Sequence, residues 1–250
     1  MTAVAASAAL EVRAYRPSDR ERVREIACRT AFRNRGHATF LDDARLFADY
    51  WTRYYTDLEP QSAFVAERDG EVVGYLLGCV DTSRFQRVMA RTVAPPIVRA
   101  LLARLLAGGY ARDARARRTL RWLAVRSWRE APDVDLSRFP AHYHANLLRG
   151  AYGSSAYTTM ALRFVDRARE AGAAGMHGQV LDRRDGGVWS EMVRAFCEAH
   201  PEVDVVSTSR ASTIGEALLG ESRPLVNRAF GTSIDGYAVF LNWLRRWRRL

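Results

Sequence analysis

The hydrophobic pattern of the chain changes its period between residues 140 and 180. Apolar and polar residues alternate through residues 141–148, which is the period of a half-buried strand. Across residues 156–168 the apolar positions recur every three or four residues, which predicts a helix with one buried face. Gly172 and Gly175 end this helix before a second strand over residues 176–181. The region therefore predicts a strand, a loop of small residues, a helix and another strand in succession.

A β-hairpin is the clearest motif elsewhere in the chain. Residues 62–67 and 72–81 predict two strands, and the Asp69-Gly70 pair between them is typical of a tight turn. The other expected elements are strands over residues 11–15, 203–207 and 236–244 and helices from Asp19 onward, over 42–56 and over 188–197. Residues 209–235 have no clear period, so no element is assigned to them.

Residues 83–131 differ from the rest of the chain because their pattern is helical and strongly basic. Between Arg84 and Arg129 the sequence has twelve arginines and one acidic residue, Asp113. Expected strands lie on both sides of this stretch. We therefore expect a single α/β domain over residues 1–250, in which residues 83–131 form a helical insertion between two strands of the sheet.

Length and composition indicate a soluble globular protein. At 250 residues and 48% hydrophobic content, the chain is long enough to bury a substantial core. No apolar run reaches the length of a membrane span, and the N-terminus lacks the basic and apolar regions of a signal peptide. The cysteines Cys28, Cys79 and Cys197 have no disulfide or metal spacing, which is typical of a reducing compartment. These features favour a cytoplasmic protein.

The net charge of +10 rests on arginine, since the sequence contains no lysine. Such a charge favours acidic partners, among them phosphorylated cofactors and anionic proteins. No nucleic acid is expected, because no recognition motif accompanies the charge, and no membrane partner is expected either. Arg115, Arg117 and Arg118 are candidates for binding an acidic macromolecule such as a small carrier protein. An ordinary solvated helix face would have the same composition.

Two histidines on the predicted strand are candidates for proton transfer. His142 and His144 are two residues apart, so they project to the same face of the strand. Histidine titrates near neutral pH, and His144 is the first candidate for a general base because it lies nearer the small-residue loop. Asp81, at the end of the second hairpin strand, is another candidate, and a structural role stays open for each histidine. No metal is expected, because these histidines and His177 have no carboxylate or cysteine at ligand spacing.

The loop before the predicted helix is rich in small residues, with Gly150, Gly153, Ser154 and Ser155 in close succession. Such a loop at a helix N-terminus presents free backbone N–H groups and the positive end of the helix dipole, so it is suited to hold a phosphate. An ordinary strand-to-helix turn would have the same composition.

The order of elements and two longer motifs resemble the GNAT superfamily of acyl-CoA-dependent N-acetyltransferases. The hairpin FVAERDGEVVGYLLGCVDT is similar to that family's second and third strands. The stretch FPAHYHANLLRGAYGSSAYTTMALRFVDRAREAGAAGMHGQV is similar to its fourth strand, pyrophosphate loop, third helix and fifth strand. The resemblance implies a mixed, mostly antiparallel central sheet flanked by helices.

The resemblance also implies that acetyl-CoA is the co-substrate. In this family, backbone groups of the fourth strand hold the pantetheine arm and polarise the thioester carbonyl, a role that falls here to residues 145–148. The loop that follows would hold the pyrophosphate. The cofactor-binding residues implied in this way are Asn146, Leu147, Leu148, Tyr152, Gly153, Ser154, Ser155, Ala156, Tyr157 and Thr158.

The sequence departs from the family pattern at two places. Ser155 and Tyr157 stand where the loop usually has small residues, and only Gly153 clearly matches the loop motif. After its fifth strand the family often has a tyrosine that protonates the departing thiolate, whereas residues 185–191 here contain none. A serine, a water molecule or a tyrosine from elsewhere in the chain would have to supply that proton.

By resemblance, the chain is expected to be an N-acetyltransferase that moves an acetyl group from acetyl-CoA directly to an amine. The acceptor is expected to be a small amino-acid-like molecule or one borne by a carrier protein, as in specialised metabolism. The alternative is a non-catalytic member of the same fold, in which the cleft and the arginine surface bind an acidic partner.

Overall fold

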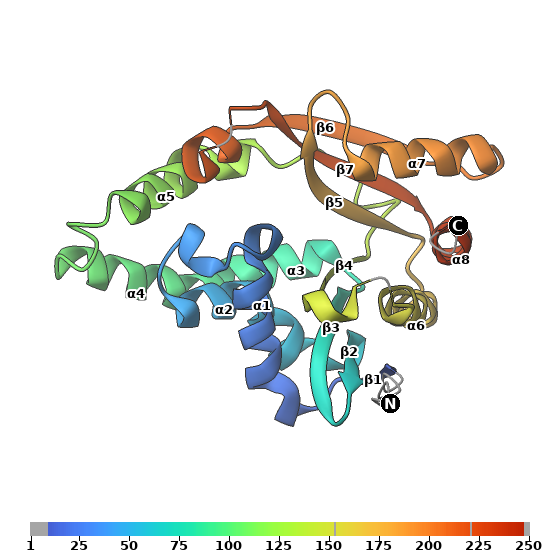
Figure 1. The fold of residues 1–250 in the computed structure, drawn as a ribbon, viewed down its shortest axis with the longest axis horizontal. Helices are drawn as coiled ribbons and strands as arrows, with labels where there is room; N and C mark the ends of the chain where they lie inside the picture. The colour runs from blue at the N-terminus through green and yellow to red at the C-terminus, as the bar shows by residue number, and fades with distance from the viewer. Residues whose placement is uncertain (1–9, 153, 221, 248–250) are drawn as a thin grey trace, which may run out of the picture.

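Two antiparallel sheets form the centre of the molecule (Figure 1). The computed structural model describes residues 10–152, 154–220 and 222–247, so Gly153 of the expected cofactor loop lies outside the described residues. One sheet has the order β1-β2-β3-β4 and the other the order β5-β7-β6. The strands are β1 (Glu11–Ala14), β2 (Ala63–Arg68), β3 (Glu71–Cys79), β4 (His142–Leu147), β5 (Gly175–Arg183), β6 (Val206–Ser212) and β7 (Leu225–Ser233).

The two sheets meet at one end of β4 and β5. An isolated parallel bridge joins Ala141 to Met176, and beyond it the two strands belong to separate sheets. The mixed, mostly antiparallel α/β fold expected from the sequence is confirmed. No helix among the residues described is both long enough and apolar enough to cross a bilayer.

Helices cover both faces of the first sheet. The helices of the described chain are α1 (Arg20–Asn34), α2 (Ala44–Arg53), α3 (Thr82–Val88), α4 (Ala94–Leu106), α5 (Ala114–Val125), α6 (Ala156–Glu170), α7 (Val188–Ala199) and α8 (Ile234–Trp247). Successive residues of β3 point to opposite faces, so Leu76 packs in the core beneath α6 and α8, whereas Leu77 packs in the core beneath α1 and α2. The sheet therefore separates an α1–α2 side from an α6–α8 side.

Local sequence signals explain where several elements begin and turn. Asp69 and Gly70 both have positive φ (53° and 78°), as a two-residue hairpin turn requires, and the predicted hairpin is confirmed as β2 and β3. Aspartates cap three helices: Asp43, Asp81 and Asp113 accept backbone N–H groups at the starts of α2, α3 and α5. The predicted strand, helix and strand over residues 141–181 are confirmed as β4, α6 and β5.

Helices α3, α4 and α5 lie in the chain between β3 and β4, and Figure 1 shows α4 and α5 extending away from the first sheet. The far end of this helical segment is tied to the second sheet. Trp122 Nε1 of α5 donates to Thr213 Oγ1 at 3.1 Å, and Glu130 accepts hydrogen bonds from both Ser212 and Thr213. This helical segment thus spans from one sheet to the other.

The strand predicted over residues 236–244 is wrong, because these residues belong to helix α8. Its buried side chains Ile234, Phe240, Leu241 and Leu244 follow a helical period, and Ser233 Oγ accepts the Gly236 N–H at 3.0 Å at the helix start. The strand expected at residues 203–207 begins later, as β6. The unassigned residues 209–235 contain most of β6 and all of β7.

Close packing between β3 and α6 generates a prediction. A Cβ atom at Gly78 would overlap the ring of Phe164 and lie 2.6 Å from the Ser62 carbonyl oxygen. Because the backbone oxygen cannot move aside, Gly78→Ala should lower the free energy of unfolding by about 1–3 kcal/mol, measured by urea denaturation. Gly150→Ala is the matched control, since its Cβ would meet only Arg68 at 3.7 Å. Equal stability of the two variants would contradict this packing.

Candidate active site

The separation of β4 from β5 opens a cavity of about 300 Å³ between the sheets. Ala141 still pairs with β5, since its N–H donates to the Gly175 carbonyl at 3.2 Å, while Leu148 N–H donates to β3 at 2.8 Å. Backbone groups alternate in direction along a strand, so the N–H and C=O groups of Tyr143 and Ala145 face the gap. The cavity therefore has backbone donors and acceptors along its β4 wall.

His142 lies on the α1–α2 side of β4, and each of its ring nitrogens contacts a hydroxyl group. Thr82 Oγ1 lies 2.6 Å from Nδ1, and the Tyr55 hydroxyl lies 3.0 Å from Nε2. Burial, followed by the nearby His177 and His144, lowers the pKa of His142 to about 3. The ring is therefore neutral near pH 7, and its nitrogens join the start of α3 and the turn Tyr54–Leu58 after α2 to β4.

His144 lies on the same face and lines the cavity. Its Nδ1 is 3.3 Å from the Tyr75 hydroxyl, and its Nε2 is 3.2 Å from Asn146 Nδ2, which also donates to the Tyr75 hydroxyl at 2.8 Å. The ring of Trp51 packs on it with centroids 5.4 Å apart. Burial lowers the pKa of His144 to about 4, so the imidazole is neutral and can accept a proton.

The remaining catalytic candidate, Asp81, serves as the N-cap of α3, with Oδ1 accepting the Arg84 N–H at 2.9 Å. Neither Asp81 nor His142 is among the described residues that line the cavity, whereas His144 and His177 are. Within the part of the chain that the structure describes, no group of three or more His, Cys, Asp or Glu side chains is placed to hold a metal ion. Of the three predicted catalytic residues, the structure thus brings only His144 to the cavity.

Three tyrosine hydroxyls meet on the other side of β4. The Tyr143 and Tyr157 hydroxyls are 2.7 Å apart, and the Tyr237 hydroxyl donates to that of Tyr143 at 3.0 Å. All three residues line the cavity. Burial raises the pKa of Tyr143 and of Tyr237 well above the ordinary value, so both hydroxyls stay protonated. Tyr157, which stands at a small-residue position of the family loop, therefore directs its hydroxyl to Tyr143 in the cavity wall.

The loop that leads into α6 is held by its own hydrogen bonds. Ser154 Oγ donates to the Ala151 carbonyl at 2.7 Å and accepts the Ala156 N–H at 3.3 Å. Thr158 Oγ1 donates to the Ser155 carbonyl at 3.0 Å. Helix α6 begins at Ala156, directly after Ser155, so its positive end faces the loop.

The other residues expected to bind a cofactor have different surroundings. The Asn146 side chain turns toward His144 on the α1–α2 side, and Leu147 is buried against α6. The Leu148 N–H is used by β3. Tyr152 is exposed, and its hydroxyl accepts a hydrogen bond from Asn34 of α1 at 2.9 Å. Binding by these residues stays a prediction that rests on the loop and the backbone of β4.

Two of the arginines predicted to bind a partner are engaged with carbonyl groups of the chain itself. Arg115 Nη1 donates to the Ala38 carbonyl at 2.8 Å, and Arg117 Nη1 donates to the Ala111 carbonyl. Arg118 is exposed on the same helix. Arg115 and Arg117 thus connect α5 to its surroundings, and their binding of a partner stays a prediction.

Comparison with known proteins bears on the fold. No protein-family model matches the sequence. The solved structure described as SsHAT is 26% identical, covers 90% of this chain and 98% of its own, and has a TM-score of 0.56. Diaminobutyrate acetyltransferase EctA from Paenibacillus lautus, in complex with L-2,4-diaminobutyric acid and coenzyme A, is 10% identical over 90% of this chain and 95% of its own, with a TM-score of 0.45. An acetyltransferase of the GNAT family from Streptococcus pneumoniae is 8% identical over 89% and 98%, with a TM-score of 0.42.

The arrangement of strands around the cavity agrees with the resemblance seen in the sequence. A four-stranded antiparallel sheet ends in β4, which bridges to a parallel β5 at one point and then diverges, and a loop and helix connect the two strands. The chain shares the fold of SsHAT over 90% of its length. A likeness of fold does not by itself identify a substrate.

Sequence reasoning missed several residues of the site. Tyr237 was assigned to a strand, although the helical period of its neighbours could have placed it on a helix. Trp51 and Tyr75, which contact His144, come from α2 and β3. No local signal in the sequence connects these residues to β4, because their contacts are long-range.

The buried histidines make stability depend on pH. Burial lowers the pKa of His142, His144 and His177 in the folded protein, whereas in the unfolded chain they titrate near 6.5. Stability is therefore complete above pH 6.5 and falls as the pH drops toward 4, because the unfolded state takes up protons that the folded state does not. At pH 5, His142 and His144 should each lower the free energy of unfolding by at most about 2 kcal/mol relative to its value above pH 6.5.

Urea denaturation at pH 7.5, 6 and 5 measures this effect. The variant His142→Asn should show a flatter dependence than the unmodified protein. An identical slope for the two proteins would contradict the neutral state of His142.

Proposed function

We propose that this protein is an N-acetyltransferase that uses acetyl-CoA and that the reaction takes place in the gap between β4 and β5. The observation that carries the proposal is one cavity bordered by backbone amides, a neutral imidazole and linked tyrosine hydroxyls. When bound, acetyl-CoA would supply an acetyl thioester, which is activated toward attack by an amine. The acceptor is proposed to be a small amine.

The residues around the gap fit the cofactor. The unpaired edge of β4 supplies hydrogen-bonding groups for an extended amide-containing chain such as pantetheine, much as an added strand would use them. At the end of the gap, the N-terminus of α6 suits a pyrophosphate. Arg68 holds the start of this loop in place, because its Nη2 donates to the Gly150 carbonyl at 3.0 Å.

Acyl transfer requires that the amine lose a proton, and His144 is the proposed acceptor. The imidazole is neutral and lines the cavity, and its contacts of 3.2 and 3.3 Å are long enough to yield to a substrate. Asn146 Nδ2 lies 3.2 Å from Nε2, and an amine that reaches Nε2 would displace it while the Tyr75 hydroxyl stays beside Nδ1. The backbone N–H groups of Tyr143 and Ala145 would donate to the oxygen that becomes negative in the transition state.

The leaving sulfur requires a proton, and the tyrosine cluster is the proposed donor. The raised pKa values of Tyr143 and Tyr237 keep their hydroxyls protonated at neutral pH. Because Tyr237 donates to Tyr143, a proton that leaves one hydroxyl can be replaced from the next. This cluster would take the place of the tyrosine that is missing after β5.

Substitution of His144 tests the proposed base. His144→Gln should lower kcat for acetyl transfer about 100-fold or more, because a positioned base contributes at least that factor. The Kd of acetyl-CoA, measured by isothermal titration, should change less than about twofold, since the ring lies on the α1–α2 side of β4, where the amine is proposed to arrive.

His200→Gln, a change at the end of α7, is the matched control and should leave both constants unaltered. An undiminished kcat in His144→Gln would remove His144 from the mechanism. If the unmodified protein failed to bind acetyl-CoA at millimolar concentration, the proposed function itself would fall.

Removal of a single hydroxyl tests the proposed proton donor. Tyr237→Phe keeps the ring in place, so kcat should fall about tenfold while the Kd of acetyl-CoA stays constant; the loss is limited because Tyr143 and Tyr157 remain. Tyr110→Phe is the control, because the buried Tyr110 hydroxyl has no hydrogen-bond partner in the described part of the chain. A lower melting temperature with unchanged kcat would make Tyr237 a structural residue only.

A further inference from the structure

A second hollow, the arginine groove, lies between α1 and α2 and extends to residues 148–150. Its volume is about 1470 Å³, several times that of the cavity between β4 and β5. Of the described residues that line it, seven are arginines and four are carboxylates. The groove is therefore positively charged overall, and a charged concave surface concentrates ligands of opposite charge.

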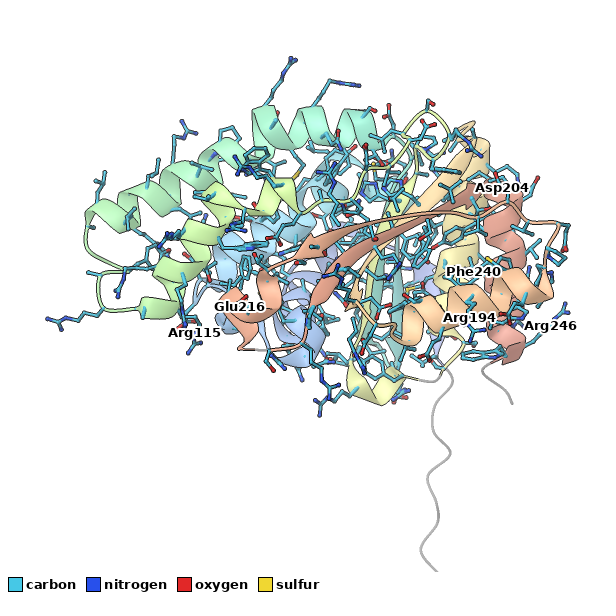
Figure 2. All side chains as sticks on the ribbon, turned by 90° about the horizontal axis from the view of Figure 1, so that it is seen from above. Arg115, Arg194, Asp204, Glu216, Phe240 and Arg246 are labelled. Atoms are coloured by element: carbon cyan, nitrogen blue, oxygen red, sulfur yellow. The ribbon has the colours of Figure 1, made fainter. Side chains whose placement is uncertain are left out.

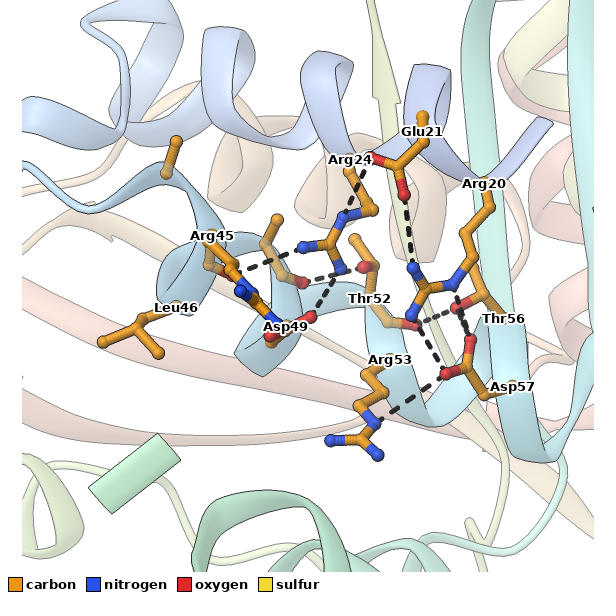
Figure 3. A network of polar contacts seen from close by, with 12 residues as sticks. Arg20, Glu21, Arg24, Arg45, Leu46, Asp49, Thr52, Arg53, Thr56 and Asp57 are labelled. Carbon is orange, nitrogen blue, oxygen red and sulfur yellow. Dashed lines mark hydrogen bonds and ion pairs between the residues drawn. The ribbon is translucent and has the colours of Figure 1, made fainter. Parts of the chain in front are cut away.

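The floor of the groove is a set of ion pairs between α1 and the α2 region (Figure 3). Arg24 Nη1 lies 2.5 Å from Asp49 Oδ1, and Arg20 Nε lies 3.1 Å from Asp57 Oδ1. The Arg24 side chain is only 11% exposed, so this pair is fixed by the packing of the two helices. These arginines have used their donors within the protein and hold the walls of the groove in place.

Two other arginines of the groove are placed differently. Arg45 on α2 and Arg149 after β4 are exposed, and neither has an acidic partner among the residues described. Arg45 is joined to the floor through its carbonyl, which accepts from Arg24 Nη2 at 3.5 Å, so its guanidinium stays available. Planar guanidinium groups with free donors bind carboxylate and phosphate oxygens with favourable geometry.

The groove and the cavity are connected through two shared elements. Asn146 lines the cavity and Leu148 lines the groove, and two residues of a strand span roughly 7 Å. On α2, Trp51 packs against His144, while Arg45 and Ala48 line the groove. A small molecule with one end in the groove could therefore present its other end at His144.

We infer that the arginine groove binds the anionic group of the acceptor, which is accordingly a small amine that also carries a carboxylate or a phosphate. This inference rests on the proposed acetyl transfer and adds the substrate class. Arg45 and Arg149 bind the anion, and the amine extends toward His144.

Matched pairs of amines test the inference. γ-Aminobutyrate is compared with γ-aminobutyramide, and phosphoethanolamine with ethanolamine, so that each pair differs in the anion. The kcat/KM of the unmodified protein should be at least about tenfold higher for an anionic member, and the pair with the larger ratio distinguishes a carboxylate site from a phosphate site. Added salt should reduce the ratio, because the arginines are exposed.

Substitution of Arg45 places the effect in the groove. Arg45→Ala should raise KM for the preferred anionic amine about tenfold, with little change in kcat and little change in KM for the neutral amine. Arg45→Lys should restore part of the lost affinity. Arg194→Ala is the control, because Arg194 on α7 is not among the described residues that line the groove, and it pairs with Glu198. In Figure 2 Arg194 lies at the opposite end of the view from Arg115, which donates to the groove residue Ala38.

Three outcomes would overturn the inference. Equal kcat/KM within both pairs would show that the acceptor needs no anion, and an unaltered KM in Arg45→Ala would place the anion elsewhere. If Arg45→Ala weakened the binding of acetyl-CoA as much as it raised KM for the anionic amine, the groove would be assigned to the phosphates of the cofactor.

Direct titration with phosphoethanolamine and with γ-aminobutyrate separates this inference from the proposed function. Binding that depends on Arg45, without acetylation of any amine, would support the anion site and contradict the acetyltransferase. Acetylation without Arg45-dependent binding of either anion would support the acetyltransferase and contradict the anion site.

Discussion

The divergence of β4 from β5 is the constraint on which the site depends. Ala141 and Met176 pair, and the next residues of the two strands belong to different sheets. One edge of β4 is fully used by β3, whereas the other edge faces the gap with its N–H and C=O groups. Buried backbone groups without partners are costly, so a protein retains such an edge where a ligand or water satisfies it.

Side chains from the helices keep the gap open. Tyr143, Tyr157 and Tyr237 come from β4, α6 and α8, and their linked hydroxyls supply polar groups within a wall of aromatic rings. Gly178 on β5 faces this cluster, since a Cβ there would lie 3.8 Å from the Tyr237 hydroxyl. The helix α8 that carries Tyr237 therefore shapes the cavity from outside the two strands that define it.

The alternation of β4 divides proton acceptor from proton donor. His144 faces α1 and α2, and Tyr143 faces α6 and α8, although the two residues are adjacent in the chain. An amine that arrives from the α1–α2 side meets the imidazole, and a thiolate on the other side meets the hydroxyls. Opposite burial effects on pKa, lowered for the histidine and raised for the tyrosine, keep both groups neutral. One strand thus positions both proton transfers of the proposed reaction.

The sequence predicted the strand, helix and hairpin because their signals are local: a period of two, a period near 3.6 and an Asp-Gly turn. It predicted α8 wrongly, because a short apolar run fits a buried strand as well as a helix. The contacts of the site have no local signal. Thr82 and His142 are 60 residues apart, and Tyr143 and Tyr237 are 94 apart.

The density of arginines along the sequence does not show which guanidinium donors are free, for the same reason. In the densest arginine run, Arg115 and Arg117 donate to backbone carbonyls, and on the groove floor Arg24 donates to Asp49. The binding capacity of a guanidinium depends on donors that remain free, and only the fold determines which donors the protein has already used. Arg45 stands alone in its stretch of sequence, yet it lacks an acidic partner in the described chain and lies in a positively charged groove. Free donors in a concave surface, rather than the number of arginines in a run, therefore indicate where an anion binds.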